Sequence, residues 1–471
     1  MLKKFLPVIL LFFHQQEIIC SADNSPDSLV VREIIIEGNY RTDTKLIFRE
    51  LTFKLNEKVS RDEIDYLRVT SINNLTKTSL FNFVEIEVVE GSEGSLSVSL
   101  GLTERWYIWP SLYLNHTDRN FNEWFRTKDL NKLEYGFGLR INNFRGMGET
   151  LHLNYRLGNF TKIELDYEGI FLDRAERNSL SFLASWSAKK LLPYIIESDK
   201  QLFLKEDYPL IKSINLSAEY RYRKGYFNSH SVELGFTDNK ISDTISFLNP
   251  YYVGLNNVRQ RFFNLRYEFI RDNRDSRVYP KTGHLLAAGI NKEGFNLIPG
   301  EYNALEIYGQ IYLYKKIIKR FYAASGIWFS SVLADDYVYS SRTGLGYLQF
   351  VRGYEYYAVN GDNSFLFKSL VKYELLPVKV INIYGWPIRK LYQFNKIPLE
   401  IYADVFFDAG YVHDGNDFYK SYNNQLVNKM MYGTGIGLDF VTYYDRVLRL
   451  DYSFNALGER GLFIHWKAAI R

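Results

Sequence analysis

The residues best suited to specific chemistry lie in one turn-rich stretch, Gln349 to Asn363. It contains four aromatic side chains and an arginine, Arg352, and its glycine, asparagine and aspartate residues favour a loop. A loop so rich in aromatics is expected to be buried. A buried arginine needs a carboxylate partner, because an unpaired charge away from water is costly. The chemistry predicted here is an arginine–carboxylate pair that holds a loop.

Other chemistries have weaker support. The seven histidines are scattered between His14 and His465, and no Gly-x-Ser-x-Gly run is present, which disfavours a barrel lipase. The alternating glycines at Gly433, Gly435 and Gly437 lack the strand-then-helix context of a nucleotide-binding loop. We expect them to face inward and make room for the loop. The sequence therefore predicts no enzyme, no cofactor and no metal site.

Residues 1–22 read as an export signal, with a basic start, a short apolar run and small residues before the cleavage point. A lipoprotein interpretation of Cys20 is disfavoured because the preceding Ile19 is bulky. Cys20 is the only cysteine, so cleavage after Ala22 leaves none. Disulfides and cysteine-ligated metals are then excluded from the mature chain.

Composition points to a membrane barrel. Hydrophobic residues make up 46% and aromatics 17%, with 38 Tyr and 34 Phe, yet the mean hydropathy is slightly negative. No run after the export signal reaches the ~18 apolar residues of a membrane helix. The net charge of +4, from 58 basic and 54 acidic residues, argues against nucleic acid as a partner.

Residues 105–471 alternate between apolar and polar with period two, as in Ile214 to Arg223 and Leu448 to Phe454. Repeated charge on one face of many long strands fits a lipid-facing exterior around a polar lumen. A coarse count gives about 16 strands, an even number, as such barrels require. The short turns then fall at one end, and long connections such as Ala334 to Ser364 fall at the other.

Two strands after the loop supply its partners. In Phe365 to Leu376 and Ile401 to Tyr411 the apolar residues face out, so the alternation directs a mixed set inward. This inward set is Lys368, Lys372, Glu374, Asp404, Phe406, Asp408 and Gly410.

A smaller α+β domain is predicted over residues 29–104. Its expected order is strand, helix, helix, strand, strand, with the second helix opened by a capping box at Ser60–Glu63. The expected elements are Val30–Glu37, Thr42–Leu51, Ser60–Ser79, Phe83–Val89 and Leu96–Leu102.

That order, with the phrases "IIIEGNYRTDTKLIFREL", "LTKTSLFNFVEIEV" and "TERW", resembles a POTRA domain. Val351-Arg352-Gly353-Tyr354, in what the strand count makes the sixth external connection, resembles the VRGF/Y signature of the BamA/TamA family and of two-partner-secretion transporters. Further matches are "YEFIRDNRDSRVYPKTG", "NNFRGMGETLHL" and "VFFDAGYV". The resemblance covers nearly all of the mature chain.

The resemblance implies that the loop folds into the barrel lumen and is locked there. Its arginine would be held by acids of the two following strands, which here are Asp408 and Glu374, although both also fit ordinary solvated lumen charges. The implied lock comprises Val351, Arg352, Gly353, Tyr354, Glu374, Phe406, Asp408 and Gly410.

The resemblance also implies a weak seam between the first and last strands that opens sideways to clients. Pro110 donates no ladder hydrogen bond, and the last strand is short. The seam residues are Trp106, Pro110, Leu462, Ile464 and Trp466. One departure is the C-terminus, where Lys-Ala-Ala-Ile-Arg follows Trp466 instead of a terminal aromatic residue.

The implied function is insertion or translocation of proteins at the outer membrane, with the POTRA domain in the periplasm. Outer-membrane lipids, unfolded outer-membrane or secreted client proteins and accessory lipoproteins are the expected partners. The alternative is a dedicated exporter that secretes one partner protein through the lumen. A passive porin is disfavoured because it needs neither the leading domain nor the aromatic loop.

Overall fold

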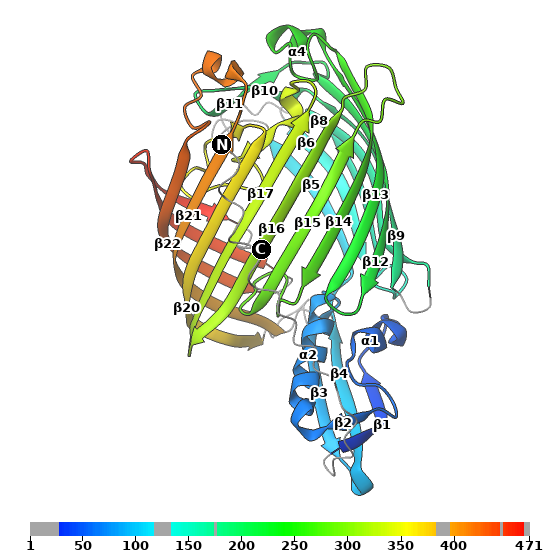
Figure 1. The fold of residues 1–471 in the computed structure, drawn as a ribbon. Coiled ribbons are helices and arrows are strands. Elements are labelled where there is room, and N and C mark those ends of the chain that lie inside the picture. Colours follow the sequence, from blue (N-terminus) through cyan, green and yellow to red (C-terminus); the bar gives the residue numbers. More distant parts are fainter. Residues whose placement is uncertain (1–27, 117–132, 174–176, 383–395, 443–445, 466–471) are drawn as a thin grey trace, which may run out of the picture.

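The computed structural model describes residues 28–116, 133–173, 177–382, 396–442 and 446–465. The predicted export signal and Trp466 lie outside these ranges. In this part of the chain no helix has both the length and the apolar character needed to cross a membrane. The fold comprises a small mixed domain followed by a large antiparallel sheet (Figure 1).

The small domain is a four-stranded sheet with two α-helices. The sheet order is β2-β1-β4-β3, with β1 and β4 parallel and the other pairs antiparallel. Buried aliphatic side chains of both helices and of β1 and β4 form its core. The elements are β1 (Ser28–Glu37), α1 (Thr44–Glu50), β2 (Lys58–Ser60), α2 (Ile64–Lys77), β3 (Phe81–Glu90) and β4 (Ser95–Glu104).

The helix caps of this domain agree with the sequence in one case and not in the other. Asp43 caps α1 by accepting a hydrogen bond from the backbone N–H of Lys45 at 2.9 Å. The capping box predicted at Ser60 is wrong, because Ser60 ends β2 and makes no side-chain cap. A short 3₁₀ turn (Arg61–Glu63) precedes α2 instead.

The large sheet has sixteen antiparallel strands, which confirms the predicted fold class. Figure 1 shows the sheet curling round into a barrel. Its strands are β5 (Ile108–His116), β6 (Leu133–Asn142), β7 (Thr150–Leu157), β8 (Phe160–Phe171), β9 (Asn178–Lys189), β12 (Ile211–Lys224), β13 (Asn228–Ile241), β14 (Arg259–Asp272), β15 (Gly283–Glu293), β16 (Ala304–Ile318), β17 (Phe321–Ala334), β20 (Asn363–Asn382), β21 (Lys396–His413), β22 (Met430–Thr442), β23 (Arg446–Asn455) and β24 (Arg460–His465).

The two faces of this sheet differ as the alternation predicts. Outward positions carry large apolar side chains that remain exposed, such as Leu216, Val405 and Ile436. Inward positions carry polar or charged groups, among them the buried Lys368 of β20 and Asp404 of β21. An apolar band around a polar interior is the pattern of a barrel that faces lipid.

The two ends of the barrel also differ. The small domain lies beyond one end, here called the domain end, where the described strand connections are mostly short. The opposite end, here called the loop end, carries a two-stranded hairpin of β10 (Leu191–Glu197) and β11 (Lys200–Lys205), a helix α4 (Asp243–Leu248) and a second pair of β18 (Thr343–Leu345) and β19 (Val359–Asn360). Buried side chains of β10, α4 and the adjoining connections form a separate apolar cluster at the loop end.

The order of the large sheet begins at β24 and ends at β5. Every neighbouring pair within it is hydrogen-bonded, but no pairing joins β24 to β5 across the described residues. These two strands are therefore the edges of the sheet, and their meeting line is here called the seam.

Candidate functional site

The connection from β17 to β20, residues 335–362, carries Arg352 into the interior of the barrel. Arg352 is 1% exposed although it belongs to a loop. Gly353 follows it with φ +93°, a left-handed conformation that favours glycine. The change of direction at Gly353 places the arginine and the following Tyr354, also buried, against the inner wall.

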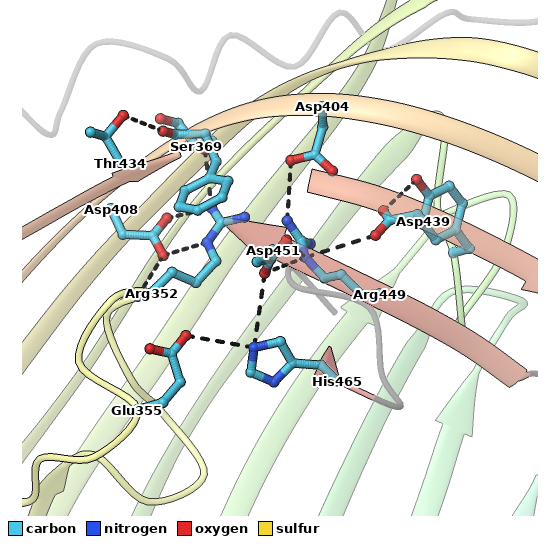
Figure 2. A network of polar contacts seen from close by, with 12 residues as sticks. Arg352, Glu355, Ser369, Asp404, Asp408, Thr434, Asp439, Arg449, Asp451 and His465 are labelled. Atoms are coloured by element: carbon cyan, nitrogen blue, oxygen red, sulfur yellow. Dashed lines mark hydrogen bonds and ion pairs between the residues drawn. The ribbon is translucent and has the colours of Figure 1, made fainter. Parts of the chain in front are cut away.

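Arg352 forms a two-pronged ion pair with Asp408 of β21 (Figure 2). Its Nε donates to Asp408 Oδ2 at 2.7 Å and its Nη2 to Asp408 Oδ1 at 2.5 Å. The backbone N–H of Arg352 donates to the same carboxylate at 3.2 Å. Asp408 is fully buried, so the loop is tied to the wall by three charge-assisted hydrogen bonds away from water.

Two further contacts fix the guanidinium plane. The ring of Phe406 lies beneath it, with 3.7 Å between Arg352 Cζ and the ring centroid. Arg352 Nη2 also donates to the carbonyl of Ser369 on β20 at 3.3 Å. Cation–π contact and hydrogen bonding thus act together on one side chain.

Small residues on the wall admit the loop. A Cβ on Gly433 of β22 would lie 1.8 Å from the carbonyl oxygen of Arg352. A Cβ on Gly410 would lie 2.4 Å from Val351, which is itself buried. Glycine is therefore required at both positions for the loop to sit this close.

The Arg352–Asp408 ion pair is here called the clamp. Glu374 does not take part in it, and its predicted pairing with Arg352 is wrong. It faces inward but lies beside Tyr402, whose hydroxyl donates to it at 3.2 Å. Asp408 is six residues from Tyr402 along β21, which is about 20 Å at the usual rise of a strand. One guanidinium cannot bridge that separation.

The prediction for the other glycines needs a similar correction. Of the three, only Gly433 makes room for the loop. A Cβ on Gly435 would meet the ring of Phe406, and one on Gly437 would meet the carboxylates of Asp404 and Asp451. These two glycines make room for side chains of the barrel wall and not for the loop. The spacing of the glycines in the sequence could not distinguish these two roles.

Comparison with known proteins finds likeness in structure only. No family model and no curated protein matches the chain. Among solved structures, CdiB from Escherichia coli matches with a TM-score of 0.51 and 11% identity, covering 93% of this chain and 75% of that one. The chain has the CdiB fold.

Two other structures match over the same share of this chain, 93%, with lower TM-scores. They are BamA from Haemophilus ducreyi lacking POTRA domains 1–3, with a TM-score of 0.48, 15% identity and 83% of that chain covered, and CdiB from Acinetobacter baumannii, with 0.45, 12% and 73%.

A second ionic cluster lies beside the clamp in this CdiB-like barrel. Arg449 of β23 is 1% exposed and donates through Nε to Asp451 at 2.6 Å and through Nη2 to Asp404 at 3.1 Å (Figure 2). Asp439 of β22 lies 3.8 Å from it. The alternation along Leu448 to Phe454 places Arg449 and Asp451 on one face, but the cluster itself was missed; inward charges on adjacent strands are the signal that could have found it.

The same cluster holds a turn from the domain end. Tyr279, in the connection from β14 to β15, donates its hydroxyl to Asp439 at 2.8 Å. Lys372 donates to the carbonyl of the next residue, Pro280, at 3.0 Å. This gives a structural role to the segment "RDNRDSRVYPKTG": the turn within it reaches into the lumen and binds side chains of β20 and β22, which are not neighbours of its own strands.

Charge is balanced across the two clusters. Their buried cations are Arg352, Lys368, Lys372 and Arg449, and their buried carboxylates are Asp404, Asp408, Asp439 and Asp451. Equal numbers of buried positive and negative charges limit the cost of burial, and removal of one member would leave a net charge in a shielded space. The arrangement can hold segments of the chain in place.

The loop also contacts the last hairpin, β23–β24. Asn455 donates to the carbonyl of Gly353 at 2.8 Å, and Tyr357 donates to Glu459 at 2.8 Å. Glu355 lies 3.5 Å from His465 Nε2 on β24 (Figure 2). The loop therefore binds one of the two strands that border the seam.

The predicted seam residues are placed as follows. Pro110 is exposed in β5, and Leu462 and Ile464 are exposed on the outward face of β24. Trp106 lies outside the strand, since β5 begins at Ile108, and its indole N–H donates to the Ile108 carbonyl. The structure does not describe Trp466.

Proposed function

We propose that the protein inserts client β-barrel proteins into the outer membrane, without catalysing a covalent reaction. The observation that carries this proposal is the seam, where β5 and β24, each paired on one side only, are not paired with each other over their described lengths. Unpaired backbone groups in a bilayer are costly, and a client strand that hydrogen-bonds to either edge would relieve that cost. The seam thus offers both a template and a route into lipid.

The location of the protein follows from its surface. Large apolar side chains remain exposed around the outside of the barrel, which supports contact with outer-membrane lipids. Outer-membrane barrels have short periplasmic turns and longer external loops. The domain end has the shorter connections, which supports a periplasmic position for the small domain.

The small domain supplies a second edge for clients. Its strand β3 (Phe81–Glu90) pairs only with β4 and is an outer strand of its sheet. An extended segment can add to such an edge through backbone hydrogen bonds, with little demand on its sequence. Unfolded outer-membrane proteins are therefore the proposed clients, and lipoproteins remain proposed accessory partners.

The exporter alternative is less well supported. Passage through the lumen requires displacement of the Arg352 clamp, which is tied by buried charged groups. It also requires opening of the apolar cluster at the loop end, whose buried members include Leu192, Tyr252 and Tyr339. A lateral route leaves both in place.

A disulfide across the seam tests the proposal. Cysteine pairs are scanned between residues 108–112 and residues 462–464, and the pair that crosslinks with the highest yield is used. We expect this crosslink to deplete many outer-membrane proteins from the cell, and reduction to restore them. Quantitative comparison of the outer-membrane and secreted proteomes is the measurement.

The matched control is a cysteine pair at Thr434 and Phe454, which are register partners on strands that are already paired. This crosslink should leave assembly unchanged. If complete inactivation of the protein removes a single secreted protein and spares the outer membrane, the chain is an exporter. Normal proteomes with a complete seam crosslink would refute a lateral route.

A further inference from the structure

A basic cleft lies between the small domain and the domain end of the barrel. It encloses about 440 Å³ and is lined by side chains of α1 and α2, by the connection from β6 to β7, and by residues at or beside the ends of β7, β8, β9 and β12–β14. Its charged lining comprises the carboxylates Glu50, Glu168 and Asp272 and twice as many cations, which are Arg49, Lys77, Arg177, Arg221, Arg223 and Arg277.

Two of the carboxylates are already engaged. Glu50 accepts from Arg223 at 2.8 Å and from Arg49 at 2.8 Å. Asp272 accepts two bonds from Arg274, at 2.8 and 2.9 Å. These two carboxylates therefore have little capacity left to neutralise the other cations of the cleft.

The charged groups of three cations form no hydrogen bond to a carboxylate in the described part of the chain, and one of them, that of Lys77, lies over the ring of Phe227 at 5.3 Å from its centroid. Arg277 lies 3.8 Å from the engaged Asp272, beyond hydrogen-bonding distance. Lys77 and Arg177 form no ion pair among the described residues. Burial is the largest influence on Lys77 and lowers the pKa of its ammonium. An anion beside Lys77 would offset this cost of burying the charge.

We propose that this cleft binds acidic side chains of an extended polypeptide as it passes from the small domain to the barrel. The geometry favours a polypeptide over a lipid headgroup, because Arg221 and Arg223 lie on the inward face of β12, away from the lipid-facing surface. Apolar walls at Phe171, Phe227 and Met147 stand beside the cations. A strand whose acidic and apolar residues alternate presents both types of contact at once.

The occupant's identity as a client rests on the proposed function, whereas the binding itself can be measured without it. The probe is a fluorescent ten-residue peptide in which glutamate alternates with valine, and the reference is the same peptide with glutamine in place of glutamate. Anisotropy is recorded with the full-length protein in detergent micelles at low and high salt. We expect the acidic peptide alone to bind, and its affinity to fall with salt.

The test variant carries Lys77→Gln and Arg277→Gln together. We expect about a tenfold loss of affinity for the acidic peptide, as two partly exposed charge pairs would give. The matched control carries Lys58→Gln and Lys319→Gln, two exposed lysines outside the cleft, and should bind like the wild type. Arg177→Gln alone, at an exposed residue, should weaken binding without loosening the domain.

Equal binding of the two peptides, or equal loss in the test and control variants, would overturn the cleft proposal. Intact discrimination between the peptides, together with normal outer-membrane assembly in the seam-crosslinked protein, would refute the proposed function and leave the cleft as an anion-binding site.

Discussion

Two arginine–carboxylate pairs hold distant parts of this chain together, and they differ in their access to water. Arg352 binds Asp408 inside the barrel, where the two side chains are 1% and 0% exposed. Arg223 of β12 binds Glu50 of the small domain, where the arginine is 28% exposed and the carboxylate 1%. The first pair joins a loop to a wall, and the second joins a domain to a barrel.

This difference predicts unequal strengths. Loss of Asp408 would leave Arg352 charged in a space that solvent does not reach, and the neighbouring cations Lys368 and Arg449 are also buried. Loss of Glu50 would leave Arg223 partly in contact with water, which can solvate it. We therefore expect the lumen loop to be a permanent part of the fold and the small domain to be the part that can separate.

The largest effect is expected from Asp408→Asn, which keeps the shape and removes the charge. It should destabilise the protein by about 3–5 kcal/mol, because the buried guanidinium loses its partner. The unfolding midpoint in detergent micelles gives the magnitude, and protease cleavage within residues 335–362 reports loop release. The matched control is Glu374→Gln, an inward carboxylate that hydrogen-bonds Tyr402 instead. Comparable losses in the two variants would mean that Arg352 is not held by Asp408.

Gly433→Ala should break the same clamp by crowding. The added Cβ would lie 1.8 Å from the carbonyl oxygen of Arg352, so the loop or β22 must shift, at about 1–3 kcal/mol. Thermal unfolding measures the loss. The control is Gly101→Ala in β4, where the nearest atom would be 3.9 Å away. A Gly433→Ala protein as stable as the control would show that the loop does not pack here.

Glu50→Gln should loosen the domain junction by about 1–2 kcal/mol while the barrel stays intact. Burial alone raises the pKa of Glu50, but hydrogen bonds and charge from Arg223 and Arg49 outweigh it and lower the pKa. A lowered pKa means that docking is stabilised above the ordinary glutamate value, about 4.3, and weakens as pH falls through the lower value.

Hydrogen exchange of α1 and of the connection from β12 to β13, measured between pH 7 and pH 3, tests this prediction. The wild type should lose protection only below about pH 4. The Glu50→Gln variant should be less protected throughout and should lack this acid transition. If the Glu50→Gln variant kept the same acid-induced loss of protection, this loss would have to arise from another titrating group.

The smallest effect is expected from removing a single hydroxyl group, either in the lumen or at the junction between the small domain and the barrel. Tyr279→Phe deletes a hydrogen bond to the buried Asp439, and Tyr226→Phe deletes one to the carbonyl of Leu51 at the junction. Tyr279→Phe should cost about 1 kcal/mol and Tyr226→Phe less, because the lumen acceptor is charged and enclosed. Denaturant titration of both variants measures the two losses in the free energy of unfolding. A larger loss for Tyr226→Phe would contradict the expectation that contacts in the lumen are stronger than those at the junction.

Much of the fold was predictable because it depends on interactions between residues that are close in the sequence. Period-two alternation follows directly from strand geometry, so the inward position of Asp408 and the outward position of Val405 could be read from the sequence. Turn-forming residues likewise identified the loop that contains Arg352. Ser60 was misassigned because its pairing with β1 is a tertiary contact that overrides a local capping signal.

The sequence by itself determined which residues face the lumen, how many strands cross the membrane, and that one loop carries an arginine that needs a carboxylate partner. Only the tertiary structure decided which carboxylate that is. Alternation makes Glu374 and Asp408 equivalent, and their separation along the wall becomes visible only once β20 and β21 are paired in register. The Arg449 cluster and the basic cleft likewise depend on strands and domains meeting across long sequence separations, which local periodicity does not encode.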